Sequence, residues 1–266
     1  MPQCCLQLTI ISNPRSLCEH LISECLAAGV KLHQPCRPIS VSQPSGDKTY
    51  IELENSSSHE RTSIHLTSLV IAAGAWSSSV IGTLFPDSPP FLQQAISSLA
   101  GHALVLRSPS WPPPALDNTD HVPTGSGCHA VFTTEAEGGY SPEIFSRMPN
   151  GEIYLAGLNS STYPLPSEVD ERVIDPAAIA ILKKTARRLC GDKVEVLRES
   201  VCWRPVTQWG TPVVHGLSNI LQSNCKVILA AGHGAWGISL SLGTGYCVAG
   251  MVQAKDMSKY VAGLGF

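Results

Sequence analysis

The sequence of 266 residues lacks several features that would place it in a common functional class. Charged residues make up only 15% and the formal net charge is -3, so no basic face is indicated and nucleic acid is not an expected partner. No apolar run approaches the roughly 18 residues of a membrane span. The first residues also lack the basic and apolar regions of a signal peptide. We therefore expect a globular, cytoplasmic protein without a membrane span.

Metal-binding and hydrolase motifs are also missing. The ten cysteines include no C-x-x-C pair and the nine histidines show no ligand spacing, so no metal site is expected. We interpret the cysteines as reduced thiols in the core. No G-x-S-x-G turn occurs, and Gly74-Ala-Trp-Ser-Ser departs from that pattern, which argues against a serine hydrolase.

The N-terminal part predicts helix and strand in alternation. Asn13 and Pro14 are a typical N-cap and first residue of a helix, and Gly29 is a typical end. A short strand is predicted over 30–32 and a loop over 35–46. Further on, residues 48–53 and 61–66 predict a hairpin with a serine-rich connection.

The middle of the chain predicts an antiparallel sheet and one helix. Residues 102–107, 129–134, 143–148 and 152–156 look like strands of this sheet, and residues 194–203 are again strand-like. Asn150-Gly151 is a typical two-residue hairpin turn. The helix should begin at Asp175-Pro176, end at Gly191, and bury Ile179, Leu182, Ala186 and Leu189.

Two apolar runs end in glycine and carry the strongest functional signal. Residues 69–73 precede Gly74, and residues 226–231 precede Gly232 and a glycine-rich helix over about 236–253. Such runs are typical of parallel strands buried on both faces. The carboxyl edge of a parallel sheet is where open α/β folds bind ligands, and glycine lets the backbone approach a ligand closely. A helix that starts there favours negative charge on the ligand.

Arg204 is a further candidate. It ends a strand-like segment just before a proline, upstream of the second glycine-ended run. Its planar guanidinium suits bidentate binding of a carboxylate. A structural ion pair with an Asp or Glu of the chain is the alternative, and the spacing leaves it open.

Together these segments resemble a known family. The motifs AAGAWS, CWRPVT and AAGHGAWGISLSLGTG occur in the order found in the FAD-dependent D-amino-acid oxidase, glycine oxidase and sarcosine oxidase (DAO) superfamily. Residues 139–157 look like a fungal branch of its cytosolic members. Asn13-Pro14 is similar to the family's His-Pro helix start, with Asn in place of His.

The resemblance implies a fold and a reaction. The fold would be α/β with two domains: an incomplete Rossmann-like FAD-binding domain from residues 1–95 and 206–266, and an inserted antiparallel substrate domain from 96–205. The activity would be hydride transfer from the C–H of a small-molecule amine or amino acid to flavin N5, with Arg204 on the substrate carboxylate. The residues that would contact FAD are Gly74, Ala75, Trp76, Gly232, His233, Gly234, Trp236, Gly237 and Ile238.

One family feature is absent from the start of the sequence. The family begins with a strand, a G-x-G-x-x-G turn and a helix, whereas here only Gly232–Gly237 matches those letters, and Asp256 beyond it follows no second apolar strand. We therefore expect a fragment whose sheet exposes an edge. Two alternatives stay open: an FAD-dependent oxidoreductase acting on a C–N bond, or an inactive remnant without tight FAD binding. The oligomeric state also stays open.

Overall fold

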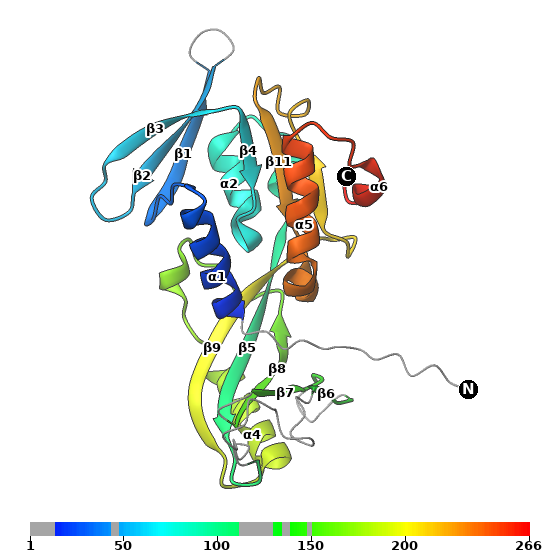
Figure 1. Cartoon of the computed structure of the whole chain (residues 1–266). Coiled ribbons are helices and arrows are strands. Elements are labelled where there is room, and N and C mark those ends of the chain that lie inside the picture. Colours follow the sequence, from blue (N-terminus) through cyan, green and yellow to red (C-terminus); the bar gives the residue numbers. More distant parts are fainter. Residues whose placement is uncertain (1–13, 44–47, 112–129, 135–138, 148–150) are drawn as a thin grey trace. The chain divides into compact units, whose positions relative to one another are not determined.

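The computed structural model describes residues 14–43, 48–111, 130–134, 139–147 and 151–266. They form two compact units (Figure 1). The first unit takes its described residues from 1–31, 101–160 and 166–202, and the second from 32–100, 161–165 and 203–266. Helices and three sheets together confirm the predicted α/β class. Asn13 and Asn150, predicted as a cap and a turn residue, lie outside the described residues.

An antiparallel sheet of the second unit includes the predicted hairpin. Its order is β1 (Cys36–Ser42), β2 (Thr49–Asn55) and β3 (Arg61–Leu66). The predicted strand over 30–32 and loop over 35–46 were wrong, because residues 30–34 are irregular and β1 occupies most of the loop. Pro38 obscured this strand. It is tolerated there because β1 is an edge strand and the register shifts between Pro38 and Ser40.

The other sheet of this unit contains both glycine-ended strands. Its order is β10 (Val213–Gly216), β11 (Lys226–Ala231) and β4 (Ser68–Ile71), and β11 is parallel to β4 as expected. Five of the six residues of β11 are buried. Burial on both faces was wrong for β4, where Val70 is 38% exposed, because β4 is the edge strand of this sheet. The core here contains Ile71, Ile81, Leu92, Val213, Leu217, Val227 and Leu229.

Short turns and helices follow each of these strands. After β4 come η1 (Gly74–Trp76), α2 (Ser77–Leu84) and α3 (Pro90–Gln93); after β11 come η3 (Gly234–Trp236), α5 (Gly237–Val252) and α6 (Ser258–Val261). The glycine-rich helix predicted over about 236–253 is thus confirmed as α5. The Lys226 ammonium donates to the carbonyls of Met251 (2.8 Å) and Val252 (2.9 Å), so a cation stabilises the C-terminal end of α5.

Most of α5 is open to solvent. Gly250 is its one buried residue, and a Cβ there would lie 2.4 Å from Met257 Sδ. Among the described residues, Gly234–Val252 is the one segment with the length and composition of a membrane span, at 19 residues and mean hydropathy 1.2. The sequence predicted no such segment because the criterion was an unbroken apolar run. Here glycine, serine and threonine interrupt the apolar residues. Length and composition alone are weak evidence for a span, because core helices of soluble proteins share them.

A five-stranded sheet lies mostly in the first unit. Its order is β6 (Ala130–Phe132), β7 (Glu143–Arg147), β8 (Glu152–Ser160), β5 (Ser97–Arg107) and β9 (Glu195–Val206). The first residues of β5 and the end of β9 from Trp203 onward belong to the second unit. The β6–β7 and β7–β8 pairs are antiparallel, which confirms the sheet predicted for the middle of the chain. Helix α4 (Pro176–Cys190) packs on this sheet, whereas η2 (Val169–Glu171) is a single turn before it. The shared core contains Leu104, Leu106, Leu155, Ile179, Leu182 and Ala186.

Helix α4 follows its sequence signals except in its last turn. The Asp175 carboxylate accepts a hydrogen bond from the Ala177 N–H (2.9 Å), and Gly191 ends the helix with φ 94°. Burial of Leu189 was wrong, since it is 40% exposed. Cys190, four residues after the buried Ala186, packs against the core in that turn instead.

Helix α1 (Pro14–Ala27) forms as predicted but buries none of its residues. Its Cys18 and Cys25 are exposed, as is Cys202, which alternates on β9 with the buried Val201. Cys225 is the one buried cysteine among the described residues, so the interpretation of the cysteines as core thiols was wrong for most of them. The described cysteines are free thiols. Their exposure could not be predicted, because the pattern of apolar residues is the same on a helix face that is covered and on one that is not.

His102 should make the stability of the first unit depend on pH. The side chain is 2% exposed, and its Nε2 accepts a hydrogen bond from the Asp175 N–H at 3.2 Å. Burial lowers the pKa of His102 below its ordinary 6.5, and the Asp175 carboxylate opposes this only in part. When the pH falls below the pKa of the histidine in the unfolded chain, the unfolded state takes up a proton before the folded state does.

The free energy of unfolding should therefore keep its full value above pH 6.5. It should decrease as the pH falls from there through the lowered pKa of His102 in the folded state. Urea denaturation at neutral and mildly acidic pH measures this decrease, and His102→Gln, which cannot titrate, should reduce it. An unchanged pH dependence in the variant would show that other groups cause it.

Candidate functional site

The carboxyl ends of β4 and β11 lie side by side. The two strands are parallel and paired from Ser68↔Lys226 to Ile71↔Leu229, so they end at the same edge of the sheet (Figure 1). Each strand continues into a Gly-Ala-Trp turn, η1 or η3, and then into a helix. Gly74 and Gly234, which begin the two turns, share a φ of 55° that favours glycine. The same strand–turn–helix unit thus occurs twice, and the two copies lie side by side.

Neither helix at this edge has a side-chain cap. Trp76 and Trp236 are the N-cap residues of α2 and α5, and within the described residues neither provides a capping hydrogen bond. Asp175 of α4 shows that the chain uses such a cap elsewhere. In the part of the chain that the structure describes, neither helix therefore has a side-chain acceptor at its first turn, although the Ser77 N–H of α2 already donates to the Gly74 carbonyl of η1. The start of α5 in particular favours a ligand with hydrogen-bond acceptors and negative charge.

The end of β9 lies against the second turn. A Cβ added at Gly232 would lie 2.6 Å from Thr207 Cγ2, and one added at Gly234 would lie 3.9 Å from Val206 Cγ1. Arg204 is two residues before Val206 and so shares its face of the strand. The structure thus brings the strand that carries Arg204 to the glycine turn. Arg204 is half-buried and interacts with another group of the chain, so a structural partner stays an alternative.

Gly232 is required by packing within the chain. Its φ is 84°, and besides Thr207 an added Cβ would meet Ile96 Cδ1 at 3.2 Å. Gly232→Ala should therefore lower the free energy of unfolding by about 2–4 kcal/mol, from backbone strain and overpacking. Chemical denaturation measures the loss, and Gly210→Ala, at φ 79° with nothing within 4 Å, isolates the part caused by strain. An equal loss in both variants would rule out the contact with Thr207 as a cause.

At Gly237, by contrast, no contact among the described residues requires a glycine. Its φ is -54°, an ordinary helical value, and an added Cβ would meet nothing closer than His233 Cβ at 3.8 Å. Glycine in a helix costs about 1 kcal/mol relative to alanine. The space beside Gly237 is open, as it is beside Gly243 and Gly245 of the same helix. The backbone at the start of α5 is therefore open to the approach of a ligand.

The other predicted residues belong to the same unit but differ in exposure. Ala75 is buried in the core, so its side chain cannot reach a ligand. Trp236 and Ile238 are open, at 71% and 48% exposed. The His233 ring is half-buried, and its Nε2 lies 2.9 Å from Thr244 Oγ1. Burial lowers the pKa of His233, so the ring is neutral at neutral pH.

Sequence reasoning missed three residues at this edge. Ser77, the first residue of α2, is fully buried, and its hydroxyl has no partner among the described residues. Thr207 packs on Gly232, and Thr244 contacts His233. A signal for Thr244 was present, because Gly237, Ser241 and Thr244 have the i, i+4, i+7 spacing of one helix face.

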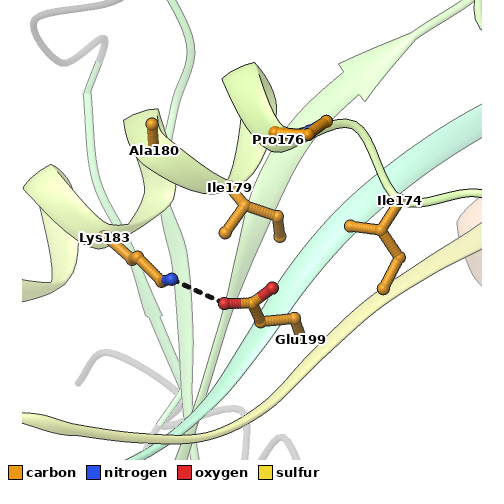
Figure 2. Close-up of a pocket in the computed structure, with 6 residues that line it drawn as sticks. All are labelled: Ile174, Pro176, Ile179, Ala180, Lys183 and Glu199. Carbon is orange, nitrogen blue, oxygen red and sulfur yellow. Dashed lines mark ion pairs between the residues drawn. The ribbon is translucent and has the colours of Figure 1, made fainter.

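A pocket of about 250 Å³ lies elsewhere, in the first unit (Figure 2). It is lined by Ile174, Pro176, Ile179, Ala180, Lys183 and Glu199. Its two charged groups, Lys183 Nζ and Glu199 Oε1, already form an ion pair at 2.6 Å. None of the candidate residues lines this pocket. Among the described residues, no group of three or more His, Cys, Asp or Glu side chains is placed to hold a metal ion.

Solved structures share the fold. Glycine oxidase from Geobacillus kaustophilus matches with a TM-score of 0.64 and 19% identity, covering 94% of this chain and 56% of the oxidase. L-Proline dehydrogenase from P. horikoshii matches with a TM-score of 0.66 and 13% identity, covering 92% of this chain and 57% of that enzyme. NikD, an amino acid oxidase of nikkomycin biosynthesis, has a TM-score of 0.68 at 13% identity, covering 94% and 59%. At these identities the likeness shows the fold alone.

The sequence also matches a family and a relative. A Schizosaccharomyces pombe protein described as an oxidoreductase is 26% identical over 204 residues, which are 73% of this chain and 44% of that protein. The chain thus spans about half the length of the relatives that it matches. The model of the FAD-dependent oxidoreductase family (DAO) matches residues 8–251, which confirms the resemblance seen in the sequence. The chain belongs to the DAO family of FAD-dependent oxidoreductases.

Proposed function

We propose that this chain carries the flavin-ring side of an FAD site and a substrate-binding arginine, in an oxidoreductase that acts on the C–N bond of an amino acid or a related amine. The observation that carries the proposal is the in-register end of β4 and β11, where two uncapped helices start. The substrate class is supported by the solved structures of similar fold, which are a glycine oxidase, an iminodiacetate oxidase and an amino acid oxidase.

Backbone groups would hold the cofactor. Gly74–Trp76 would contact it at the first junction. At the second, the contacts would come from Gly232, His233, Gly234, Trp236, Gly237 and Ile238. The N–H groups of Gly237 and Ile238, at the start of α5, would donate to the carbonyl edge of the ring and stabilise negative charge there. When bound, the flavin supplies the hydride acceptor, so the chain needs no side-chain base.

Arg204 would orient the substrate. Its guanidinium would bind the carboxylate through two parallel hydrogen bonds, which fixes the position of the adjacent C–H bond. Arg204 lies near the end of β9, where Val206 and the following Thr207 pack on the glycine turn. In this assignment residues 96–205 form a substrate domain, and residues 1–95 and 206–266 form the remainder of the FAD-binding domain.

Flavin content and anaerobic reduction test the proposal. The purified chain should show the flavin absorbance bands, which a panel of D-amino acids, glycine, sarcosine and larger amines should bleach in the absence of oxygen. Bleaching by carboxylated amines, and not by matched amines without the carboxylate, is the expected pattern. A colourless chain that takes up no added FAD would instead support an inactive remnant. The edge position of β4 is in keeping with that alternative.

A further inference from the structure

His233 is held along one face of α5. Its backbone belongs to the turn before the helix, and its Nε2 lies 2.9 Å from the hydroxyl of Thr244, eleven residues further on. Between them lie Gly237 and Ser241, with Leu240 beside them on the helix, and an added Cβ at Gly237 would be 3.8 Å from His233 Cβ. Small residues at these positions leave room for the ring to lie along the helix. His233 and Thr244 thus connect the glycine turn to the middle of α5.

The Thr244 hydroxyl can be the donor in this pair, whose direction depends on the tautomer of His233. Other helix hydroxyls donate to carbonyls of their own helix: Thr83 to Ser79 (3.0 Å), Ser239 to Trp236 (3.1 Å) and Ser241 to Ile238 (2.8 Å). Within the described residues Thr244 makes no such bond, so its hydrogen is available to His233 Nε2. A neutral ring that accepts at Nε2 carries its proton on Nδ1.

We propose that Thr244 is a positioning residue of the flavin site: its hydroxyl fixes the His233 ring as the Nδ1–H tautomer and thereby holds the Gly232–Gly234 turn on the first turn of α5. This rests on the proposed function, because the groups that the pair holds in place are the Gly237 and Ile238 amides assigned to the cofactor. Loss of the hydroxyl frees the ring, and the amides then become mobile.

Nuclear magnetic resonance of the chain without added FAD tests the positioning. Thr244→Val keeps the size of the side chain but removes the hydroxyl, Thr244→Ser keeps the hydroxyl, and Thr83→Val is a matched control whose hydroxyl bonds within its own helix. The ¹⁵N shifts of His233 should report the Nδ1–H tautomer in the parent and in Thr244→Ser, and a mixture in Thr244→Val. Amide exchange at Gly234–Ile238 should be about three to ten times faster in Thr244→Val only. Unchanged shifts and exchange would overturn the proposal.

FAD titration separates this inference from the proposed function. The dissociation constant should rise about three- to tenfold in Thr244→Val and stay at the parent value in Thr244→Ser and Thr83→Val. If the parent binds FAD and Thr244→Val binds it equally well, the positioning role is wrong while the proposed function stands. If the parent binds no FAD, the proposed function fails for this chain, and the tautomer and exchange data still decide whether Thr244 orders the turn.

Discussion

Gly237→Ala is expected to weaken FAD binding by about 10- to 100-fold, because the new methyl group would overpack the contact between backbone and flavin ring. The chain itself has room for the methyl group, with its nearest neighbour at 3.8 Å. Stability should stay unchanged or rise by up to about 1 kcal/mol, since alanine is the better helix former. Fluorescence titration with FAD and urea denaturation of the same sample measure the two effects, and Gly237→Val should bind still less.

Gly243→Ala is the matched control for this change. It lies in the same helix, and a Cβ there would meet nothing within 4 Å. The variant should gain similar stability and keep the FAD affinity of the parent. Equal FAD affinity in Gly237→Ala and Gly243→Ala would show that the cofactor does not approach the start of α5.

Arg204→Ala should raise KM for carboxylated amines by roughly 100-fold or more, because it removes a bidentate, charge-assisted contact. FAD content should stay the same, since none of the proposed cofactor contacts involves this side chain. Arg204→Lys should be intermediate, because an ammonium keeps the charge but lacks the planar fork. Steady-state kinetics on the protein loaded with FAD measures the effect.

Arg198→Ala provides the comparison for Arg204. Arg198 lies on the same strand, β9, an even number of residues away, so it shares the face of Arg204 but lies six residues upstream. It should leave KM unchanged. If Arg204→Ala also left KM unchanged but lowered stability, Arg204 would be a structural ion-pair partner, as its interaction within the chain allows.

The parts of the fold that the sequence predicted well are those with local signals. The apolar runs before Gly74 and Gly232 predicted the strands, and glycine marked both ends because only a left-handed backbone makes those turns. Asp175 and Gly191 bounded α4 for similar local reasons. At the candidate site, the motif residues were found because they belong to these turns.

Apart from the strand that Pro38 obscured, the errors share one physical origin, which is that burial depends on partners far away in sequence. The strand that contains Val70 was expected to be buried on both faces, yet it is an edge strand and Val70 is exposed. Cys18 and Cys25 were interpreted as core thiols, yet they lie on a helix that buries none of its residues. Thr244 was missed because its importance comes from a contact with His233 across the turn, which only the folded chain shows.

Amide chemical shifts measured during addition of FAD test the central claim most directly. If the flavin lies at the shared edge of β4 and β11, the perturbed amides should be those of Gly74–Trp76 and Gly232–Ile238, two segments that lie far apart in sequence. Shifts confined to one segment, or centred on the pocket at Lys183 and Glu199, would contradict it.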